Sequence, residues 1–315
     1  MSMQPYKFEP LYKQRIWGGW ELAPRFGKRL WQSPAIGEMW CLADLPQGDS
    51  RVANGPDAGK GLAALLAEKG GDILGEARAL PDGRFPLLLK LLAAAERLSL
   101  QVHPDAAAAA LGPPAAMKTE CWYVLESCDG YILKGCKAGV TEADFRRALA
   151  AGDNAGALTE LVERYEVRPG EFHYLPAGTV HALGPGVVVA EVQTPSDTTF
   201  RVSDWGRGRP VHVDQALRCI HYNPAPATPG AEGDVLVRSE HFTVRRLVRP
   251  IGESAVPAGE CVAWMVLAGA GEIRSGSDEA VSVSAPETVL LPAAMGPAAL
   301  AVAEDMTILE VALPR

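Results

Sequence analysis

The sequence lacks paired cysteines and long apolar runs. Its 315 residues include 6 cysteines, none of them in a Cys-x-x-Cys pair, so neither a zinc knuckle nor a thioredoxin-like site is indicated. No apolar run reaches the roughly 18 residues of a membrane span, and the first residues contain no apolar stretch typical of a secretory signal peptide. We therefore expect reduced, buried thiols in a cytoplasmic protein without a membrane span.

The sequence also lacks an excess of basic residues. It has 30 Lys and Arg against 38 Asp and Glu, a net charge of −8. This balance argues against a nucleic-acid or anionic-membrane partner, because both bind basic surfaces. A small phosphorylated ligand is not excluded, because it needs only a few local cations.

Glycine and proline, by contrast, are plentiful along the whole chain. The 32 Gly and 25 Pro residues separate many short apolar runs, a pattern typical of short strands and turns. We therefore predict a mainly β fold with a few short inserted helices. The predicted strands lie at residues 85–92, 98–102, 121–125, 131–133, 187–192, 211–213, 242–248, 262–267, 288–291 and 306–311.

Three segments have the composition of helices. Residues 60–69 are rich in Ala and Leu and precede a Gly-Gly pair, which is a helix stop signal. Residues 141–150 begin with a capping-box pattern. Residues 155–164 are predicted to continue this helix as a helical hairpin, so 141–164 is a small helical insert.

The segment Leu-Ser-Leu-Gln-Val-His-Pro contains the first candidate ligands. In a strand, residues two apart face the same side, so Ser99, Gln101 and His103 would share one face. An imidazole and an amide oxygen suit zinc and other divalent metals. Taken alone, such a histidine is more often hydrogen-bonded within a core.

Two further segments add to this set. Lys118 and Glu120 share a face if Lys-Thr-Glu-Cys-Trp-Tyr is a strand, and an exposed edge strand is the alternative. Residues 170–181 fit Gly-x5-Pro-x-Gly-x2-His, the second motif of cupin β-barrels, in which the last residue, His181, points inward. His173 lies outside that turn and is not expected to be a ligand. Together, Gln101, His103, Glu120 and His181 could hold a zinc ion.

A polar segment follows the predicted strand at 187–192. Its candidates for substrate contact are Glu191, Asp197, Arg201 and Arg207. Arginine offers a fixed fork of donors for phosphate or sugar oxygens. A solvated loop with internal salt bridges would have the same composition.

These motifs occur in the order found in one enzyme family. The sequence resembles the type I mannose-6-phosphate isomerases (phosphomannose isomerases), particularly the short bacterial form, over roughly residues 5–222. The matching motifs are KQRIWGG at 13–19, IGEMW at 36–40, LLKLL at 88–92, LSLQVHPD at 98–105, KTECWY at 118–123, LPAGTVHAL at 175–183 and the segment 191–201.

The resemblance implies roles for individual residues. The metal ligands of the family match Gln101, His103, Glu120 and His181, which implies one Zn²⁺ per chain or another divalent metal. The family's essential arginine matches Arg201, and we expect Lys118 or Glu191 to carry the acid/base step. The other residues that match the substrate pocket are Lys90, Ser99, Asp197 and Arg207.

The resemblance also implies two cupin-like β-barrel or jelly-roll halves. A linker rich in Pro, Ala and Gly begins at residue 224. Residues 1–223 would form the metal-binding catalytic domain, and residues 224–315 resemble a degenerate second half without metal ligands. We expect a monomer or a homodimer, and the sequence does not decide between them.

The implied reaction interconverts mannose 6-phosphate and fructose 6-phosphate through a cis-enediol, so the expected partner is a small sugar phosphate. Three alternatives remain open at this point. The chain could be a non-catalytic sugar-phosphate-binding cupin. It could isomerise another phosphorylated aldose, because the pocket walls choose the sugar. An iron-dependent cupin dioxygenase fits less well, since the first motif is Gln-x-His.

Overall fold

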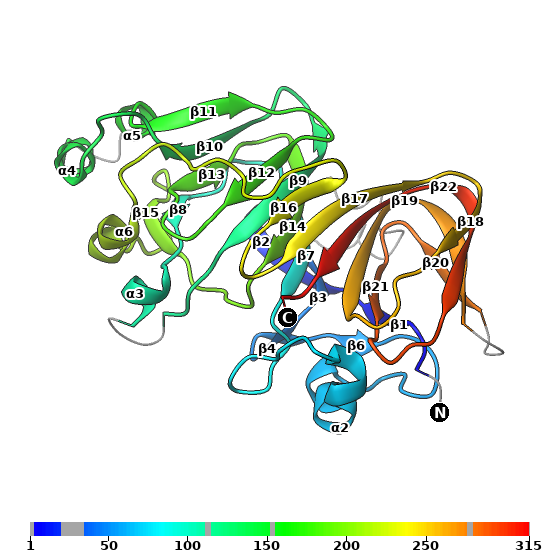
Figure 1. The fold of residues 1–315 in the computed structure, drawn as a ribbon. Coiled ribbons are helices and arrows are strands. Elements are labelled where there is room, and N and C mark those ends of the chain that lie inside the picture. The colour runs from blue at the N-terminus through cyan, green and yellow to red at the C-terminus, as the bar shows by residue number, and fades with distance from the viewer. Residues whose placement is uncertain (1–2, 20–34, 111–114, 152–154, 276–279, 315) are drawn as a thin grey trace. The chain divides into compact units, whose positions relative to one another are not determined.

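The computed structural model describes residues 3–19, 35–110, 115–151, 155–275 and 280–314. The chain forms two compact units. Unit 1 consists of Met1–Tyr12, Met39–Lys90 and Thr228–Arg315, and unit 2 consists of Lys13–Glu38 and Leu91–Ala227. Both units are built mainly of antiparallel strands (Figure 1), which confirms the predicted mainly β fold.

Unit 1 contains one large sheet and one helix. The strand order is β16-β17-β22-β19-β21-β1-β6, with β18 on β22 and β20 on β19, and β4 pairs with β5. The elements are β1 (Tyr6–Glu9), β4 (Asp44–Leu45), β5 (Gly48–Asp49), β6 (Arg51–Val52), α2 (Leu62–Leu74), β16 (Val235–Arg238), β17 (Thr243–Arg249), β18 (Gly252–Ala255), β19 (Val262–Ser275), β20 (Val281–Ser284), β21 (Thr288–Leu291) and β22 (Ala298–Ala312).

The long strands β19 and β22 form the centre of the unit 1 sheet. Their pairing shifts register around Gly269, where the backbone φ is +78° and a Cβ atom would lie 2.2 Å from the Asp305 carbonyl oxygen. Only glycine fits such a bulge. Across the same pair, the indole of Trp264 donates to the buried carboxylate of its register partner Glu310 at 3.1 Å. Arg245 on β17 donates to the other carboxylate oxygen at 3.0 Å.

Unit 2 contains two sheets. The five-stranded sheet has the order β11-β10-β13-β8-β15, and the six-stranded sheet has the order β12-β9-β14-β7-β3-β2. The strands are β2 (Leu11–Gly19), β3 (Ile36–Leu42), β7 (Leu88–Ala94), β8 (Leu100–Val102), β9 (Glu120–Ser127), β10 (Tyr131–Cys136), β11 (Val162–Glu166), β12 (Phe172–Leu175), β13 (His181–Leu183), β14 (Val187–Gln193) and β15 (Phe200–Ser203). Along the chain, β2, β3 and β7 each run from one unit into the other.

Apolar side chains from both sheets meet in one core of unit 2. Ile132 and Leu183 of the five-stranded sheet pack with Trp122, Val124 and Val189 of the six-stranded sheet. Alternate residues along each strand face this core, as the period of a strand requires. The pairing among described strands leaves both sheets open rather than closed into the predicted barrel.

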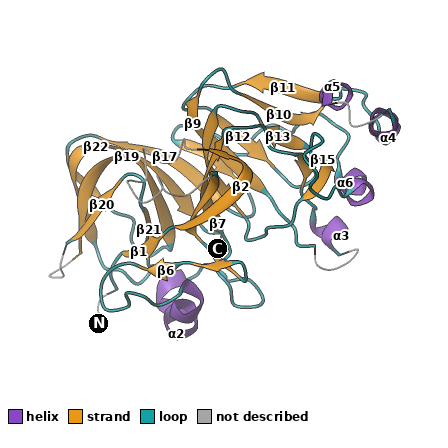
Figure 2. Ribbon diagram, turned by 180° about the vertical axis from the view of Figure 1, so that it is seen from behind, coloured by secondary structure: helices purple, strands orange, loops and turns teal. Residues whose placement is uncertain are grey.

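Helices cover the outer face of the five-stranded sheet (Figure 2). They are α3 (Ala106–Ala109), α4 (Glu142–Ala150), α5 (Ala155–Thr159) and α6 (Val213–Cys219). The predicted capping box of α4 is confirmed, because the Asp144 carboxylate accepts from the backbone N–H and the hydroxyl of Thr141. No helix in the described ranges is both long and apolar enough to span a bilayer.

Three local predictions were wrong. Residues 155–164 are not one helix, because the chain leaves α5 at Thr159 and forms β11, which pairs with β10. Residues 211–213 are not a strand, since α6 begins at Val213. Helix α2 does not end at the predicted residue 69 but continues through the Gly-Gly pair to Leu74, because Ile73 and Leu74 are buried. The backbone of Lys69 is not helical, so the helix is kinked at this residue.

The compact units differ from the predicted domains in one respect. The chain passes from unit 2 to unit 1 at residue 228, inside the predicted linker that begins at residue 224. Residues 1–12 and 39–90, however, group with the C-terminal segment and not with the rest of residues 1–223. Strand pairing explains the grouping of residues 1–12, because β1 pairs with β21, which lies near the C-terminus in the sequence.

Candidate active site

One row of polar residues crosses the five-stranded sheet of unit 2. Arg201 on β15 lies opposite Gln101 on β8, and Gln101 lies opposite His181 on β13. Directly opposed residues in an antiparallel pair project from the same face. His103 follows β8 directly and is two residues from Gln101, so the sheet brings two histidines together; their ring centroids are 4.9 Å apart.

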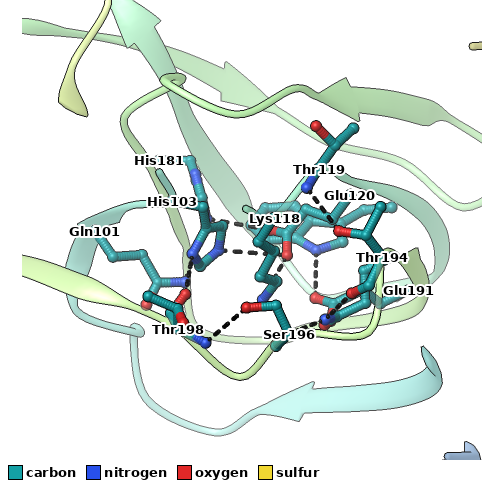
Figure 3. A network of polar contacts seen from close by, with 12 residues as sticks. Gln101, His103, Lys118, Thr119, Glu120, His181, Glu191, Thr194, Ser196 and Thr198 are labelled. Carbon is teal, nitrogen blue, oxygen red and sulfur yellow. Dashed lines mark hydrogen bonds and ion pairs between the residues drawn. The ribbon is translucent and has the colours of Figure 1, made fainter. Parts of the chain in front are cut away.

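Glu120 reaches the two histidines from the other sheet. It is the first residue of β9, and its carboxylate oxygens lie 3.4 Å from His103 Nε2 and 3.2 Å from His181 Nε2. One candidate ligand atom from each of the three residues lies within 4.8 Å of the others. Figure 3 shows these side chains converging. We refer to His103, Glu120 and His181 as the triad.

Backbone carbonyls fix which nitrogen each histidine presents to the triad. His103 Nδ1 lies 2.8 Å from the carbonyl oxygen of Thr198, and His181 Nδ1 lies 2.8 Å from that of Thr179. A carbonyl can only accept, so each Nδ1 must carry the proton and each Nε2 must present its lone pair. This is the arrangement by which proteins orient histidine ligands for a metal.

The triad fits a divalent metal ion. Its three residues are at most 1% exposed. His103 Nε2 and both carboxylate oxygens of Glu120 are buried without a hydrogen bond among the described residues, although Oε2 forms an ion pair with Lys118. Buried polar atoms normally have such partners, so their shared orientation is explained by a cation. Two imidazole nitrogens and one carboxylate are a ligand set found in catalytic zinc sites, which keep a fourth position open.

Lys118 supplies the nearest positive charge. Its ammonium lies 2.8 Å from Glu120 Oε2 and is buried. Burial is the largest single influence on Glu120 and would raise its pKa, but the charge of Lys118 together with His103 and His181 outweighs burial and holds that pKa well below its ordinary value. Burial, reinforced by Lys118, lowers the pKa of His103 to about 3. At neutral pH the triad therefore contains a carboxylate at Glu120 and a neutral imidazole at His103.

Gln101 adjoins the triad but presents its amide nitrogen. Its Nε2 lies 3.2 Å from His181 Nε2, while its Oε1 accepts from Ser99 Oγ at 3.2 Å. Turning the amide by 180° would direct Oε1 toward the triad, and the two orientations differ only in the assignment of N and O. Its role as a fourth ligand remains a prediction.

Glu191 contacts the triad through a tryptophan. Its Oε2 accepts from the indole of Trp122 at 2.9 Å, and that indole lies edge-on against His181 at 5.5 Å between centroids. The two residues are register partners on β14 and β9.

The two predicted arginines differ in how far the protein engages them. Arg207 donates from Nε, Nη1 and Nη2 to the Asp204 carbonyl, the Arg97 carbonyl and the Asp204 carboxylate. Arg201 makes one side-chain hydrogen bond, to the Pro210 carbonyl at 3.4 Å, and its Nε is buried without a partner among the described residues. Burial and then the charge of Arg209 lower the pKa of Arg201. Arg201 is therefore the arginine with donors to spare.

The remaining predicted residues are spread over both units. Ser99 is buried beside Gln101, and Asp197 is exposed on the loop before β15. Lys90 belongs to unit 1, where its ammonium lies 5.4 Å from the Trp40 ring centroid. His173 lies on β12 outside the triad, as expected.

Sequence reasoning missed the groups that hold the triad. Thr179 and Thr198 act through backbone carbonyls, which no side-chain motif reveals. Gly178, by contrast, belongs to the turn that the sequence motif predicted before His181: its φ is +83°, its N–H donates to the His103 carbonyl, and a Cβ would lie 2.5 Å from the His221 ring. The one available signal was the density of Ser and Thr between 194 and 199.

Two buried histidines make the metal-free protein sensitive to acid. Burial lowers the pKa of His103 to about 3 and that of His173 to about 4, from 6.5. Between pH 6.5 and about 4 the unfolded chain therefore binds more protons, so the free energy of unfolding falls as the pH falls. The loss is about 1.4 kcal/mol per pH unit for each group.

This sensitivity is measurable by urea unfolding of the metal-free protein. We expect His173→Gln to reduce the decline of unfolding free energy between pH 6.5 and 4.5 relative to wild type. Equal declines in the two proteins would contradict a neutral, buried His173.

Comparisons with known proteins agree on one family. A model of the "Phosphomannose isomerase type I, catalytic domain" matches residues 6–124. A Streptococcus mutans mannose-6-phosphate isomerase is 37% identical over 290 residues, covering 86% of this chain and 89% of that protein. The crystal structure of the Bacillus subtilis mannose 6-phosphate isomerase superposes with a TM-score of 0.86 at 30% identity, covering 99% of this chain and all of that one.

A third relative carries a metal. The solved structure of a zinc-bound mannose 6-phosphate isomerase shares the fold, with a TM-score of 0.76 at 17% identity over 99% of this chain and all of that one.

Proposed function

The chain belongs to the type I phosphomannose isomerase family, and from this premise we propose that it interconverts mannose 6-phosphate and fructose 6-phosphate. The observation that carries the proposal is the triad of unit 2, in which one buried ligand atom from each of three residues lies within 4.8 Å of the others. His103 Nε2 and the Glu120 carboxylate oxygens have no hydrogen bond among the described residues. Lys118 supplies a cation beside this triad, and Arg201 is the register partner of Gln101 on the neighbouring strand. A sugar phosphate is the substrate that needs both a metal site and cations.

We assign the cofactor as one zinc ion per chain, held by His103, Glu120 and His181 with Gln101 as a further ligand. The donor set of imidazole and carboxylate supports zinc, as does the zinc-bound relative that shares the fold. When bound, zinc supplies positive charge that stabilises the negative oxygens developing during proton transfer.

Lys118 is our choice for the proton-transferring group. The reaction takes a proton from carbon 2 of the open-chain aldose and returns one to carbon 1, so it needs a base that becomes an acid. Lys118 Nζ lies 2.8 Å from Glu120, directly beside the triad. As the neutral amine it would take the proton from carbon 2, and as the ammonium so formed it would return a proton to carbon 1. Glu191, the other candidate, is instead bonded to the indole of Trp122, so we assign it the role of holding that ring against His181.

Arg201 is our choice for the residue that holds the substrate. Arg201 is the register partner of Gln101, so its side chain projects from the same face of the sheet as the ligands. Its buried Nε has no partner among the described residues. A guanidinium with unused donors can bind phosphate or sugar oxygens in a fixed geometry. Arg207 supports the site from outside, because its donors secure the backbone at Arg97 and Asp204.

The proposal is tested by a coupled assay of the purified chain with mannose 6-phosphate. The protein is assayed as isolated, after chelation, and after zinc is restored. We expect chelation to lower the turnover number by about 100-fold or more, the cost of losing one oriented electrostatic stabiliser, and zinc to restore it.

No turnover by the zinc-loaded chain would contradict the proposal. A screen of other phosphorylated aldoses would then separate an isomerase of another sugar from a protein that only binds sugar phosphates.

A further inference from the structure

Residues 194–198 lie in the connection between β14 of the six-stranded sheet and β15 of the five-stranded sheet. We call them the crossing loop. The triad also draws on both sheets, because Glu120 begins β9 while His103 and His181 belong to β8 and β13 or follow them directly. The spacing of the three ligands therefore depends on the contacts that hold the two sheets of unit 2 together near the triad.

Side-chain hydroxyls tie the crossing loop to the segment 116–119, which leads into β9. Thr119 and Thr194 exchange two bonds, from Thr194 N to the Thr119 carbonyl at 3.0 Å and from Thr119 N to Thr194 Oγ1 at 3.1 Å. Further along, Ala116 N donates to Thr198 Oγ1 at 3.1 Å. Hydroxyls here take the place of the backbone groups of a regular ladder (Figure 3).

Ser196 is the centre of this arrangement and is buried. Its hydroxyl donates to the Ala116 carbonyl at 3.1 Å and accepts from the Thr198 backbone N–H at 3.1 Å. Its own carbonyl accepts from the Gln193 amide at 2.6 Å. A hydroxyl has one donor proton, so this bridge uses that proton and joins the segment before Glu120 to the residue that contacts His103.

The contact with His103 is the Thr198 carbonyl, which accepts the imidazole Nδ1 proton at 2.8 Å. We propose that Ser196 is a positioning residue for the metal site, holding the Thr198 carbonyl where it selects the His103 tautomer that presents Nε2 to the triad. The inference rests on the proposed metal site and adds a residue to it. Among the described residues the hydroxyl of Ser196 bonds to Ala116 and Thr198 and not to the triad, so it would act through Thr198.

The consequence concerns metal affinity. Thr198 has two anchors, the bond from its N–H to Ser196 Oγ and the bond from Ala116 N to its hydroxyl. Without the bridge Thr198 loses the first of them, its carbonyl is held less firmly, and the His103 ring can carry its proton on Nε2 instead of Nδ1. Changes in the groups that orient metal ligands typically cost about 10- to 100-fold in affinity. We therefore expect Ser196→Ala to raise the zinc dissociation constant by about that factor, measured by competition with a chromophoric chelator.

A second readout needs no metal and no activity. The ¹⁵N chemical shifts of labelled histidine distinguish the two neutral tautomers, and His103→Gln assigns the His103 signals. In the metal-free wild type we expect His103 to be protonated at Nδ1. In Ser196→Ala we expect a mixture of the two tautomers.

Ser239→Ala is a matched control in unit 1. The Ser239 hydroxyl also bridges backbone groups, donating to the Phe242 carbonyl and accepting from the N–H groups of His241 and Phe242. We expect the melting temperature of this variant to fall by about as much as that of Ser196→Ala, without a change in zinc affinity.

Two further variants vary the hydroxyl of Ser196 itself. Ser196→Thr keeps the hydroxyl and should show the wild-type tautomer and affinity. Ser196→Cys is nearly isosteric but a weak donor, so it should behave as Ser196→Ala and replaces it if Ser196→Ala does not fold.

The inference is overturned if Ser196→Ala, or Ser196→Cys in its place, keeps the wild-type tautomer of His103 and the wild-type zinc affinity. It is also overturned if Ser239→Ala loses affinity to the same extent, because the effect would then reflect stability alone. A wild-type chain that binds no zinc would contradict the proposed metal site, and the ¹⁵N measurement would still decide the role of Ser196.

Discussion

His181→Ala is expected to remove the bound metal and the isomerase activity together. His181 Nε2 lies 3.2 Å from Glu120, and the ring also braces Trp122, so the variant loses a ligand and opens a gap between the two sheets. We expect zinc affinity to fall by more than the roughly 100-fold that outer groups contribute. The turnover number at fixed zinc should fall by about 1,000-fold or more, and metal content measured by atomic emission should fall with it.

His173→Ala is the matched control for this variant. It removes an imidazole from β12 of the same unit, outside the triad. It should keep its zinc and its turnover number. Full zinc occupancy in His181→Ala would contradict the assignment of His181 as a ligand.

Lys118→Met is expected to abolish turnover while zinc stays bound. Methionine keeps the length and apolar stem of the lysine but cannot transfer a proton. Loss of a general acid/base typically lowers the turnover number by about 10²- to 10⁴-fold. Zinc should bind at least as tightly as in wild type, because the ammonium 2.8 Å from Glu120 competes for that carboxylate. Steady-state kinetics and chelator competition on the same preparation separate the two effects.

Lys137→Met provides the comparison. Lys137 is a surface residue in the same unit, with its side chain 40% exposed and paired to Glu160, and its loss should change neither quantity. A turnover number for Lys118→Met within about tenfold of wild type would place the proton transfer on another group, and Glu191 would be the next to test.

The triad was predictable because each of its residues is fixed by local geometry. His103 directly follows the short strand β8, and Glu120 is the first residue of β9. The Pro-x-Gly-x-x-His turn places His181 at the start of β13. Arg201 could be placed near them once the register across β15, β8 and β13 is known. The mainly β fold follows from the same short alternating runs.

What the sequence could not decide depends on partners distant in the chain. Arg201 and Arg207 look alike in the sequence, but only Arg207 is bonded to Asp204 and to the Arg97 carbonyl. Residues 162–166 carry a helix-compatible composition, and the free edge of β10 makes them a strand. In the first case the difference comes from distant hydrogen-bond partners. In the second, strand pairing overrides the local helix propensity.

A cross-strand pair of an indole and a carboxylate occurs in each unit. Trp122 donates to Glu191 in unit 2, and Trp264 donates to Glu310 in unit 1, and in each case the two are register partners. Unit 1 has this pair without the triad of histidines and glutamate among its described residues. The pair is thus scaffolding shared by both units, whereas among the described residues the triad is present in unit 2 alone.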